Sequence, residues 1–109
     1  MSYEVIVTKR FERELKRLLK KYKSLKFEYA KLIDNIEKDS CFGEAIGNNC
    51  YKIRVKIASK QKGKSGGARV ISFVYTPKEK VYLLAIYDKS DISNMGENVI
   101  DSRISELEL

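Results

Sequence analysis

The residues best suited to chemistry in this sequence are cations gathered in one short stretch. Residues 45–78 contain no acidic side chain, while the whole chain carries a formal net charge of +7. Ordinary solvated surfaces mix charges of both signs, whereas a concentrated cationic surface attracts polyanions, above all the phosphodiester backbone. The stretch therefore predicts contact with nucleic acid, and a merely solvated strand and loop is the alternative. Seven cations fall within residues 52–69, namely Lys52, Arg54, Lys56, Lys60, Lys62, Lys64 and Arg69.

The absence of histidine limits the chemistry open to this chain. It excludes Ser-His-Asp and Cys-His catalysis, histidine-based zinc sites and the two-histidine ribonuclease mechanism. The two cysteines, Cys41 and Cys50, are too few for a disulfide framework and lack metal-ligand spacing, so we expect reduced, partly buried thiols. We predict no metal and no cofactor.

Gly63-Lys64-Ser65 matches the end of a phosphate-binding Walker A loop, but its surroundings do not fit. The motif needs a glycine where this chain has Ala58, and it needs a following helix where residues 68–74 predict a strand. The glycines at positions 63, 66 and 67 instead allow a tight hairpin and the close approach of a ligand to the backbone.

The elements that must position these cations belong to one small domain, which we predict to span residues 1–109. Alternating apolar residues predict a first strand at residues 3–7. Two helical patterns follow Thr8 and Ser24, which can cap them, and their apolar stripes share the spacing of an antiparallel helical hairpin. Residues 40–49 contain glycines and asparagines and predict a connecting loop.

Three more strands and a last helix complete the predicted domain. Residues 50–58 alternate between inward apolar side chains and outward cations, while residues 68–75 and 81–87 are apolar on both faces, as in central strands. Residues 93–109 predict a short helix. Its apolar side would consist of Val99, Ile100, Ile104 and Leu107. The order β-α-α-β-β-β-α predicts an α+β fold, with a helical hairpin packed on one face of an antiparallel sheet.

Three linked segments give a specific resemblance to a known family. They are YKIR at residues 51–54, GKSGGARVI at residues 63–71 and YLLAIYDK at residues 82–89. Together they resemble the RelE/ParE superfamily of bacterial toxins, particularly its HigB-like branch. The resemblance implies a RelE-like fold and a toxin of a type II toxin–antitoxin system. Such a toxin cleaves mRNA on the ribosome, inhibits translation and is neutralised by a cognate antitoxin.

The implied activity, a metal-independent endoribonuclease, agrees with the residues present. The 2′-hydroxyl of RNA can attack the adjacent phosphorus, so the protein need only align the nucleotide, neutralise the phosphorane and help move two protons. Arginine suits the second task because its planar fork holds two phosphate oxygens and keeps its charge. Arg69, at the start of a central strand after a double glycine, is the first catalytic candidate, and Arg54 on the neighbouring strand is the second.

The resemblance adds candidates for proton transfer. Tyr87 and Lys89, at the end of the last strand, match the family's other functional cluster and could supply an acid or stack on a base. Asp88 could either act in catalysis or pair with a lysine, and Ser90 stands where RelE-type members often carry an arginine. A lysine crowded by like charges could act as the base, with Lys52, Lys56 and Lys64 as candidates. The lysines that we predict to bind RNA are Lys52, Lys56, Lys60, Lys62 and Lys64.

Two other functions stay open, namely a ParE-like gyrase inhibitor and a non-catalytic RNA- or ribosome-binding module. The partners implied by the resemblance are a cognate antitoxin protein and mRNA on the 70S ribosome, and a toxin–antitoxin hetero-oligomer could bind operator DNA. No apolar run approaches the ~18–20 residues needed to span a membrane, and no signal-peptide pattern is present. We therefore expect a cytoplasmic protein without a membrane partner.

Overall fold

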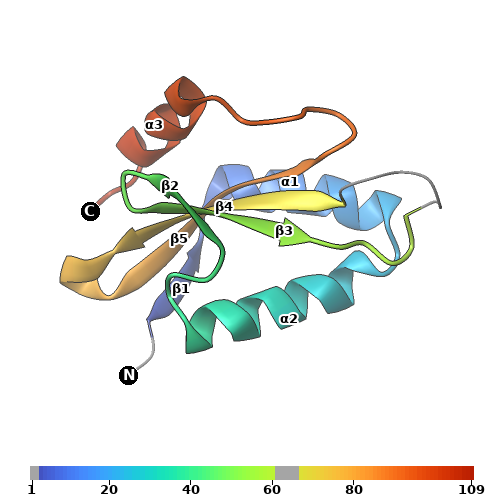
Figure 1. Ribbon diagram of the computed structural model, residues 1–109, viewed down its shortest axis with the longest axis horizontal. Coiled ribbons are helices and arrows are strands. Elements are labelled where there is room, and N and C mark those ends of the chain that lie inside the picture. Colours follow the sequence, from blue (N-terminus) through green and yellow to red (C-terminus); the bar gives the residue numbers. More distant parts are fainter. Residues whose placement is uncertain (1–2, 61–66) are drawn as a thin grey trace.

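The computed structural model describes residues 3–60 and 67–109, which form a five-stranded sheet with helices on both faces (Figure 1). The strand order is β1-β5-β4-β3-β2, in which β1 runs parallel to β5 and every other neighbouring pair is antiparallel. This arrangement confirms the predicted α+β class. The elements are β1 (Glu4–Val7), α1 (Lys9–Lys21), α2 (Leu25–Lys38), β2 (Glu44–Gly47), β3 (Cys50–Val55), β4 (Ala68–Tyr75), a 3₁₀ turn (Thr76–Lys78), β5 (Lys80–Asp88) and α3 (Glu97–Ser105).

The short strand β2 lies where the sequence predicted only a loop. It pairs with the beginning of β3 through the two-residue turn Asn48-Asn49, and both asparagines have positive φ angles, 54° and 62°. Asparagine tolerates this left-handed conformation, and a two-residue hairpin turn of this kind requires it at both positions. The glycine and asparagine residues that suggested a loop therefore build a hairpin.

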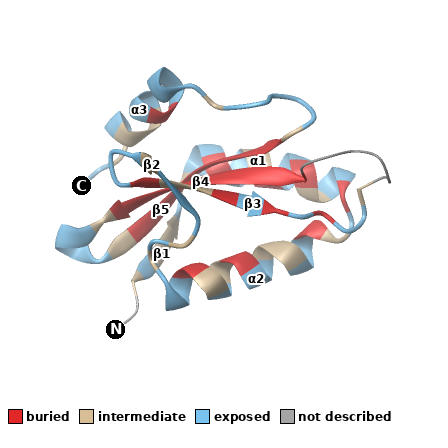
Figure 2. Ribbon diagram, in the orientation of Figure 1, coloured by how far each residue is buried: buried red, intermediate tan, exposed pale blue. Residues whose placement is uncertain are grey.

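Two apolar cores lie on opposite faces of the sheet. Helices α1 and α2 cover one face, where the alternation of β3 places Ile53 and Val55 in the first core and leaves Arg54 exposed on the other side. The second core lies under α3 and includes Ile71, Phe73 and Ile100. Figure 2 shows the continuous burial of β4 and β5 between these layers, which agrees with their apolar sequences. The predicted helical hairpin on one face is thus confirmed.

The two predicted helix caps differ in their contacts. Thr8 caps α1 by accepting a hydrogen bond from the Phe11 amide at 3.4 Å, and its hydroxyl donates to the Leu83 carbonyl of β5 at 2.7 Å. Ser24 precedes α2 but makes no capping hydrogen bond; its hydroxyl instead donates to Glu28 Oε1 at 3.0 Å. The start of α1 is therefore attached directly to the sheet.

The last helix, α3, is shorter and less regular than its apolar pattern suggested. Ile100 is buried, and Ile104 and Leu107 pack against the second core, but Val99 is 45% exposed. The prediction that Val99 belongs to the inward side was therefore wrong, because the helix turns this position away from the sheet. Within residues 3–60 and 67–109, no helix has the length and apolar character that crossing a membrane requires.

Candidate functional site

Three of the predicted catalytic residues form a row across the three central strands, next to the end of β3, the start of β4 and the end of β5. Arg54 on β3 is the register partner of Arg69 on β4, and Arg69 is the register partner of Tyr87 on β5. Side chains of register partners project from the same face of a sheet, here the face that α3 covers. We call these residues the Arg54–Arg69–Tyr87 row. Exposure falls along it, since Arg54 is exposed while Arg69 and Tyr87 retain only 8% and 4%.

Arg69 owes its place to the glycine two positions before it. Gly67 has a φ of +53°, and a Cβ atom there would lie 2.2 Å from the Val55 carbonyl oxygen, so no other residue fits without a shift. The Gly67 carbonyl accepts a hydrogen bond from the Lys89 amide at 3.0 Å, and the Arg69 guanidinium donates to the Ala68 carbonyl at 3.1 Å. The beginning of β4 is thus tied to the end of β5, where the other predicted cluster lies.

Tyr87 presents a buried phenol. Its hydroxyl makes no hydrogen bond of normal geometry to the part of the chain that the structure describes. Burial raises the pKa of Tyr87, and the nearby Met95 amide and the charge of Arg69 offset only part of this rise. The phenol therefore remains protonated at neutral pH and is suited to donate a proton rather than to accept one.

Residues 90–96, which make up most of the segment between β5 and α3, lie over this face, and we call them the connector (Figure 1). Two of the predicted site lysines hold it. The Lys89 ammonium donates to the Ser93 carbonyl at 2.8 Å, and the Lys52 ammonium donates to Asn94 Oδ1 at 3.2 Å. Met95 packs against the core cluster that contains Tyr87. The connector thus contributes to burying the inner end of the row.

The remaining predicted RNA-binding lysines are placed differently. Lys56 is exposed beyond the end of β3 and, with Lys31, lines a cavity of about 290 Å³ between α2 and β3. Lys60 is not at the surface: its side chain is 5% exposed, and its ammonium donates to Asp88 Oδ1 at 2.7 Å. Direct phosphate contact by Lys60 therefore does not fit this structure, because its ammonium is already inside an ion pair. Lys62 and Lys64 lie outside the described residues.

Asp88 takes the pairing role that the sequence left open. Burial alone would raise the pKa of Asp88, but hydrogen bonds from Lys60, Tyr22 and the Ser90 amide hold it well below its ordinary value. Its carboxylate is fully buried and lies on the face of the sheet that α1 and α2 cover, opposite the row. This position argues against direct contact with a substrate that binds at the row.

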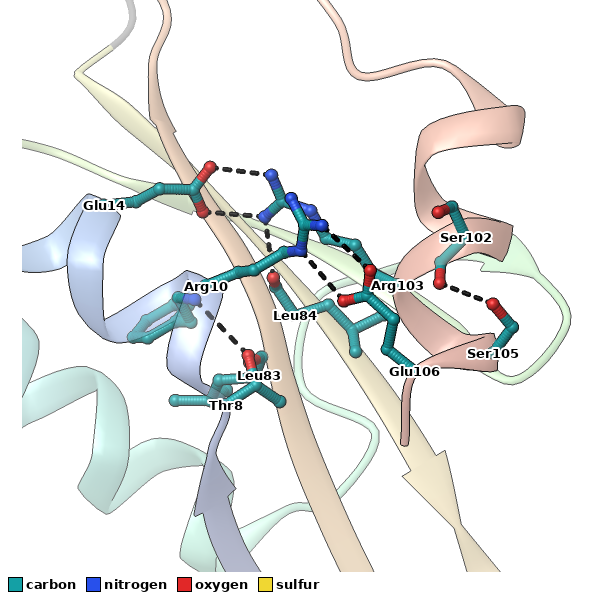
Figure 3. Close-up of polar contacts among 10 residues, drawn as sticks. Thr8, Arg10, Glu14, Leu83, Leu84, Ser102, Arg103, Ser105 and Glu106 are labelled. Carbon is teal, nitrogen blue, oxygen red and sulfur yellow. Dashed lines mark hydrogen bonds and ion pairs between the residues drawn. The ribbon is translucent and has the colours of Figure 1, made fainter. Parts of the chain in front are cut away.

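Sequence reasoning missed a set of contacts between α1 and α3 (Figure 3). The Arg103 guanidinium forms a bidentate pair with Glu14 at 2.8 and 2.9 Å and donates to the Leu84 carbonyl, while the Ile86 amide donates to Glu14. Arg10 forms a second bidentate pair with Glu106. The sheet register shifts at Leu84, so these side chains satisfy polar groups of β5 beyond the end of β1. Opposite charges far apart in the sequence were the only available signal.

The two cysteines are far apart in character. Cys41 is exposed and Cys50 is buried, and both are free thiols. Burial raises the pKa of Cys50 to about 11, so this thiol stays protonated and unreactive at neutral pH. Neither sulfur is part of a disulfide in the structure, and the predicted partial burial describes neither cysteine.

The sequence matches no protein-family model. The structure, however, is similar to solved structures of the Escherichia coli toxin RelE. A free double arginine-to-alanine variant of RelE has a TM-score of 0.61 and 17% sequence identity, with 99% of this chain and 100% of that chain covered. The same variant in complex with a peptide of the antitoxin RelBc has a TM-score of 0.57 and 16% sequence identity, with 99% of this chain and 100% of that chain covered. The isolated RelE toxin has a TM-score of 0.55 and 17% sequence identity, with 97% of this chain and 100% of that chain covered. Membership of the HigB-like branch stays a prediction. Because the similarity to these RelE structures covers nearly the whole chain, the chain has the fold of the RelE toxin.

Proposed function

We propose that this protein is the toxin of a type II toxin–antitoxin system and cleaves mRNA on the ribosome without a metal ion. The observation that supports this proposal best is the Arg54–Arg69–Tyr87 row, with Lys52 and Lys89 beside it. It joins two guanidinium groups and a protonated phenol on one face of a RelE-like fold. Scattered surface lysines would be enough to bind phosphates without this alignment.

In the proposed reaction the RNA supplies its own nucleophile. The 2′-oxygen attacks the adjacent phosphorus, and the bond to the 5′-oxygen breaks, leaving a 2′,3′-cyclic phosphate and a 5′-hydroxyl. Arg54 and Arg69 would hold the non-bridging oxygens and stabilise the phosphorane. Tyr87 would give its proton to the departing 5′-oxygen. Lys52 lies on the same face of the sheet as the row and is the proposed base that would take the proton of the 2′-hydroxyl.

This mechanism requires the connector to move. Tyr87 is 4% exposed, so RNA cannot reach its hydroxyl in the free protein. The oxygens of Ser93 and Asn94 lie on the Lys89 and Lys52 ammoniums, where phosphate oxygens would bind. We expect ribosome-bound mRNA to replace these two contacts, in keeping with active-site hydrogen bonds that form only in the substrate complex.

The proposed partners follow from the same assignment. Similarity to RelE solved with an antitoxin peptide supports a protein antitoxin. A cytoplasmic location is part of the proposal, because the proposed substrate is mRNA on ribosomes. Binding of operator DNA by a toxin–antitoxin hetero-oligomer is part of the proposal as well. Co-expression of the antitoxin should restore the growth of cells that produce the protein.

A non-catalytic ribosome-binding module is the second candidate, and the burial of Arg69 and Tyr87 favours it. A translating extract with a defined mRNA separates the two, with primer extension used to locate any cuts. Cleavage dependent on ribosomes supports the toxin. Inhibited translation with intact mRNA supports the binding module, and inhibition of DNA supercoiling with neither effect on translation would support a ParE-like gyrase inhibitor.

A further inference from the structure

A buried ion pair lies directly behind the Arg54–Arg69–Tyr87 row, on the face of the sheet that α1 and α2 cover. Asp88 is the register partner of Ala68 and stands in sequence between Tyr87 and Lys89. Its carboxylate accepts hydrogen bonds from the Tyr22 hydroxyl at 2.5 Å, from the Lys60 ammonium at 2.7 Å and from the Ser90 amide at 2.8 Å. The Lys21 ammonium lies 3.6 Å away, at a largely exposed position. The end of α1, the segment after β3 and the end of β5 therefore meet at one carboxylate.

The Lys60 ammonium joins this carboxylate to the beginning of β4. It donates to the Gly67 carbonyl at 3.2 Å as well as to Asp88, and the same carbonyl accepts the Lys89 amide. Gly67 lies two residues before Arg69, so a bond that fixes the Gly67 carbonyl also restrains the backbone from which the Arg69 side chain projects. Lys60 thus connects the backbone that carries Arg69 with the strand end that carries Tyr87 and Lys89.

Burial of this pair is not explained by stability alone. Two charges removed from water lose hydration that their attraction often fails to repay, and apolar residues of similar volume commonly serve as well. A buried ion pair does restrict the positions of its two side chains and of the backbone bonded to them. Here the restricted backbone segments are those beside Arg69, Tyr87 and Lys89.

We infer that Lys60 and Asp88 are positioning residues for the proposed RNA cleavage: their ion pair holds the ends of β4 and β5 so that Arg69, Tyr87 and Lys89 keep their relative places. This inference rests on the proposed function. It gives Lys60 a role different from the RNA contact that its sequence context predicts. Neither residue touches the substrate.

The test uses three variants of the full chain and one control. Asp88→Asn and Lys60→Met each remove one charge, and the double variant removes both, so that no charge stays buried without a partner. Lys20→Met is the matched control, because Lys20 is an exposed lysine near the end of α1 and has no part in the proposed site. For each protein we would measure the single-turnover cleavage rate at saturating ribosomes, ribosome affinity, thermal unfolding and amide hydrogen exchange at Lys89.

The expected result is a loss of rate with little loss of affinity. Displacement of catalytic groups by about an ångström can cost on the order of a hundredfold in rate, so we expect losses approaching this in each single variant. The double variant should recover part of the rate. Lys89 amide exchange should accelerate in the single variants while amides in the middle of β4 keep their protection. Lys20→Met should leave the cleavage rate and the Lys89 exchange at the parental values.

Three results would overturn the inference. Lys60→Met with the parental rate at saturation and reduced affinity would make Lys60 an RNA contact. Single variants that unfold at lower temperature, yet cleave normally while folded, would make the pair merely structural. Unchanged Lys89 amide exchange in Lys60→Met would show that the pair does not hold this strand end. A parent protein that cleaves no mRNA would instead contradict the proposed function, and the exchange measurement would still decide whether the pair fixes the strand ends.

Discussion

Arg54 and Arg69 are register partners on neighbouring antiparallel strands, so two cationic side chains project side by side from one face of the sheet. Like charges directly opposite each other destabilise a sheet. Residues 45–78 contain no acid, so neither strand carries an acidic neighbour of these arginines in sequence. The pairing agrees with the proposed binding of an anionic ligand at the row.

Replacing Arg54 by glutamine should therefore separate activity from stability. Arg54→Gln should preserve or modestly raise the free energy of unfolding, because repulsion from Arg69 disappears, while mRNA cleavage falls. Urea denaturation and the cleavage rate at saturating ribosomes measure the two effects. A variant that is less stable and fully active would contradict the proposed role of Arg54.

Gly67→Ala should be strongly destabilising. The substitution combines a left-handed backbone, which costs about 1–3 kcal/mol for a residue other than glycine, with a contact of 2.2 Å to the Val55 carbonyl. Gly47→Ala is the matched control, because Gly47 also has a positive φ, +95°, but its added Cβ meets nothing within 4 Å. Equal losses of unfolding free energy in the two variants would show that the contact with Val55 is unimportant.

Asp88 should make the stability of the protein depend on acid pH. The pKa of Asp88 is lowered in the folded protein, so its stabilisation is fully present above the unfolded value of about 4. As pH falls below that value, Asp88 becomes protonated in the unfolded chain but stays ionised in the folded protein, so the unfolding free energy decreases. Chemical denaturation from pH 6 to about pH 2 should show a steeper loss for the parent than for Asp88→Asn. Parallel curves would mean that Asp88 titrates alike in both states.

The connector should respond to loss of its contact with Lys52. Asn94→Ala removes the acceptor for the Lys52 ammonium, so RNA should meet less competition at that lysine. We expect cleavage at subsaturating ribosomes to be equal to or faster than that of the parent, with a small loss of thermal stability. Asn98→Ala, at an exposed position of α3, is the control. Slower cleavage by Asn94→Ala alone would mean that the Lys52–Asn94 contact helps to form the active conformation.

Much of the fold was predictable because its long elements carry strong patterns. The strand at residues 68–75 was predicted with the bounds of β4, since an uninterrupted apolar run between turn residues allows few alternatives. The alternation of β3 placed Arg54 on the outward face for the same reason. In contrast, β2 has four residues, and its turn of two asparagines is easily taken for a loop.

The site was less accessible from sequence, because its contacts join distant positions. The hydroxyl of Tyr22, at the end of α1, donates a hydrogen bond to Asp88, which lies 66 residues away in sequence. Likewise, Lys60 follows the end of a strand, where alternation no longer tells which way a side chain points. Its charge suggested a surface role, and only the folded chain brings Asp88 within 2.7 Å of its ammonium.

The central claim is that Arg69 acts in RNA cleavage, and single-turnover cleavage of mRNA on saturating ribosomes tests it most directly. Losing a transition-state contact of this kind costs about 2.7–4 kcal/mol, or on the order of a hundred- to a thousandfold in rate. Arg69→Ala should therefore nearly abolish cleavage while ribosome binding falls only modestly, and Lys56→Ala should weaken binding and keep the saturated rate. Thermal unfolding of both variants confirms that the proteins are folded. Cleavage by folded Arg69→Ala at the parental rate would contradict the account and make Arg69 a binding residue.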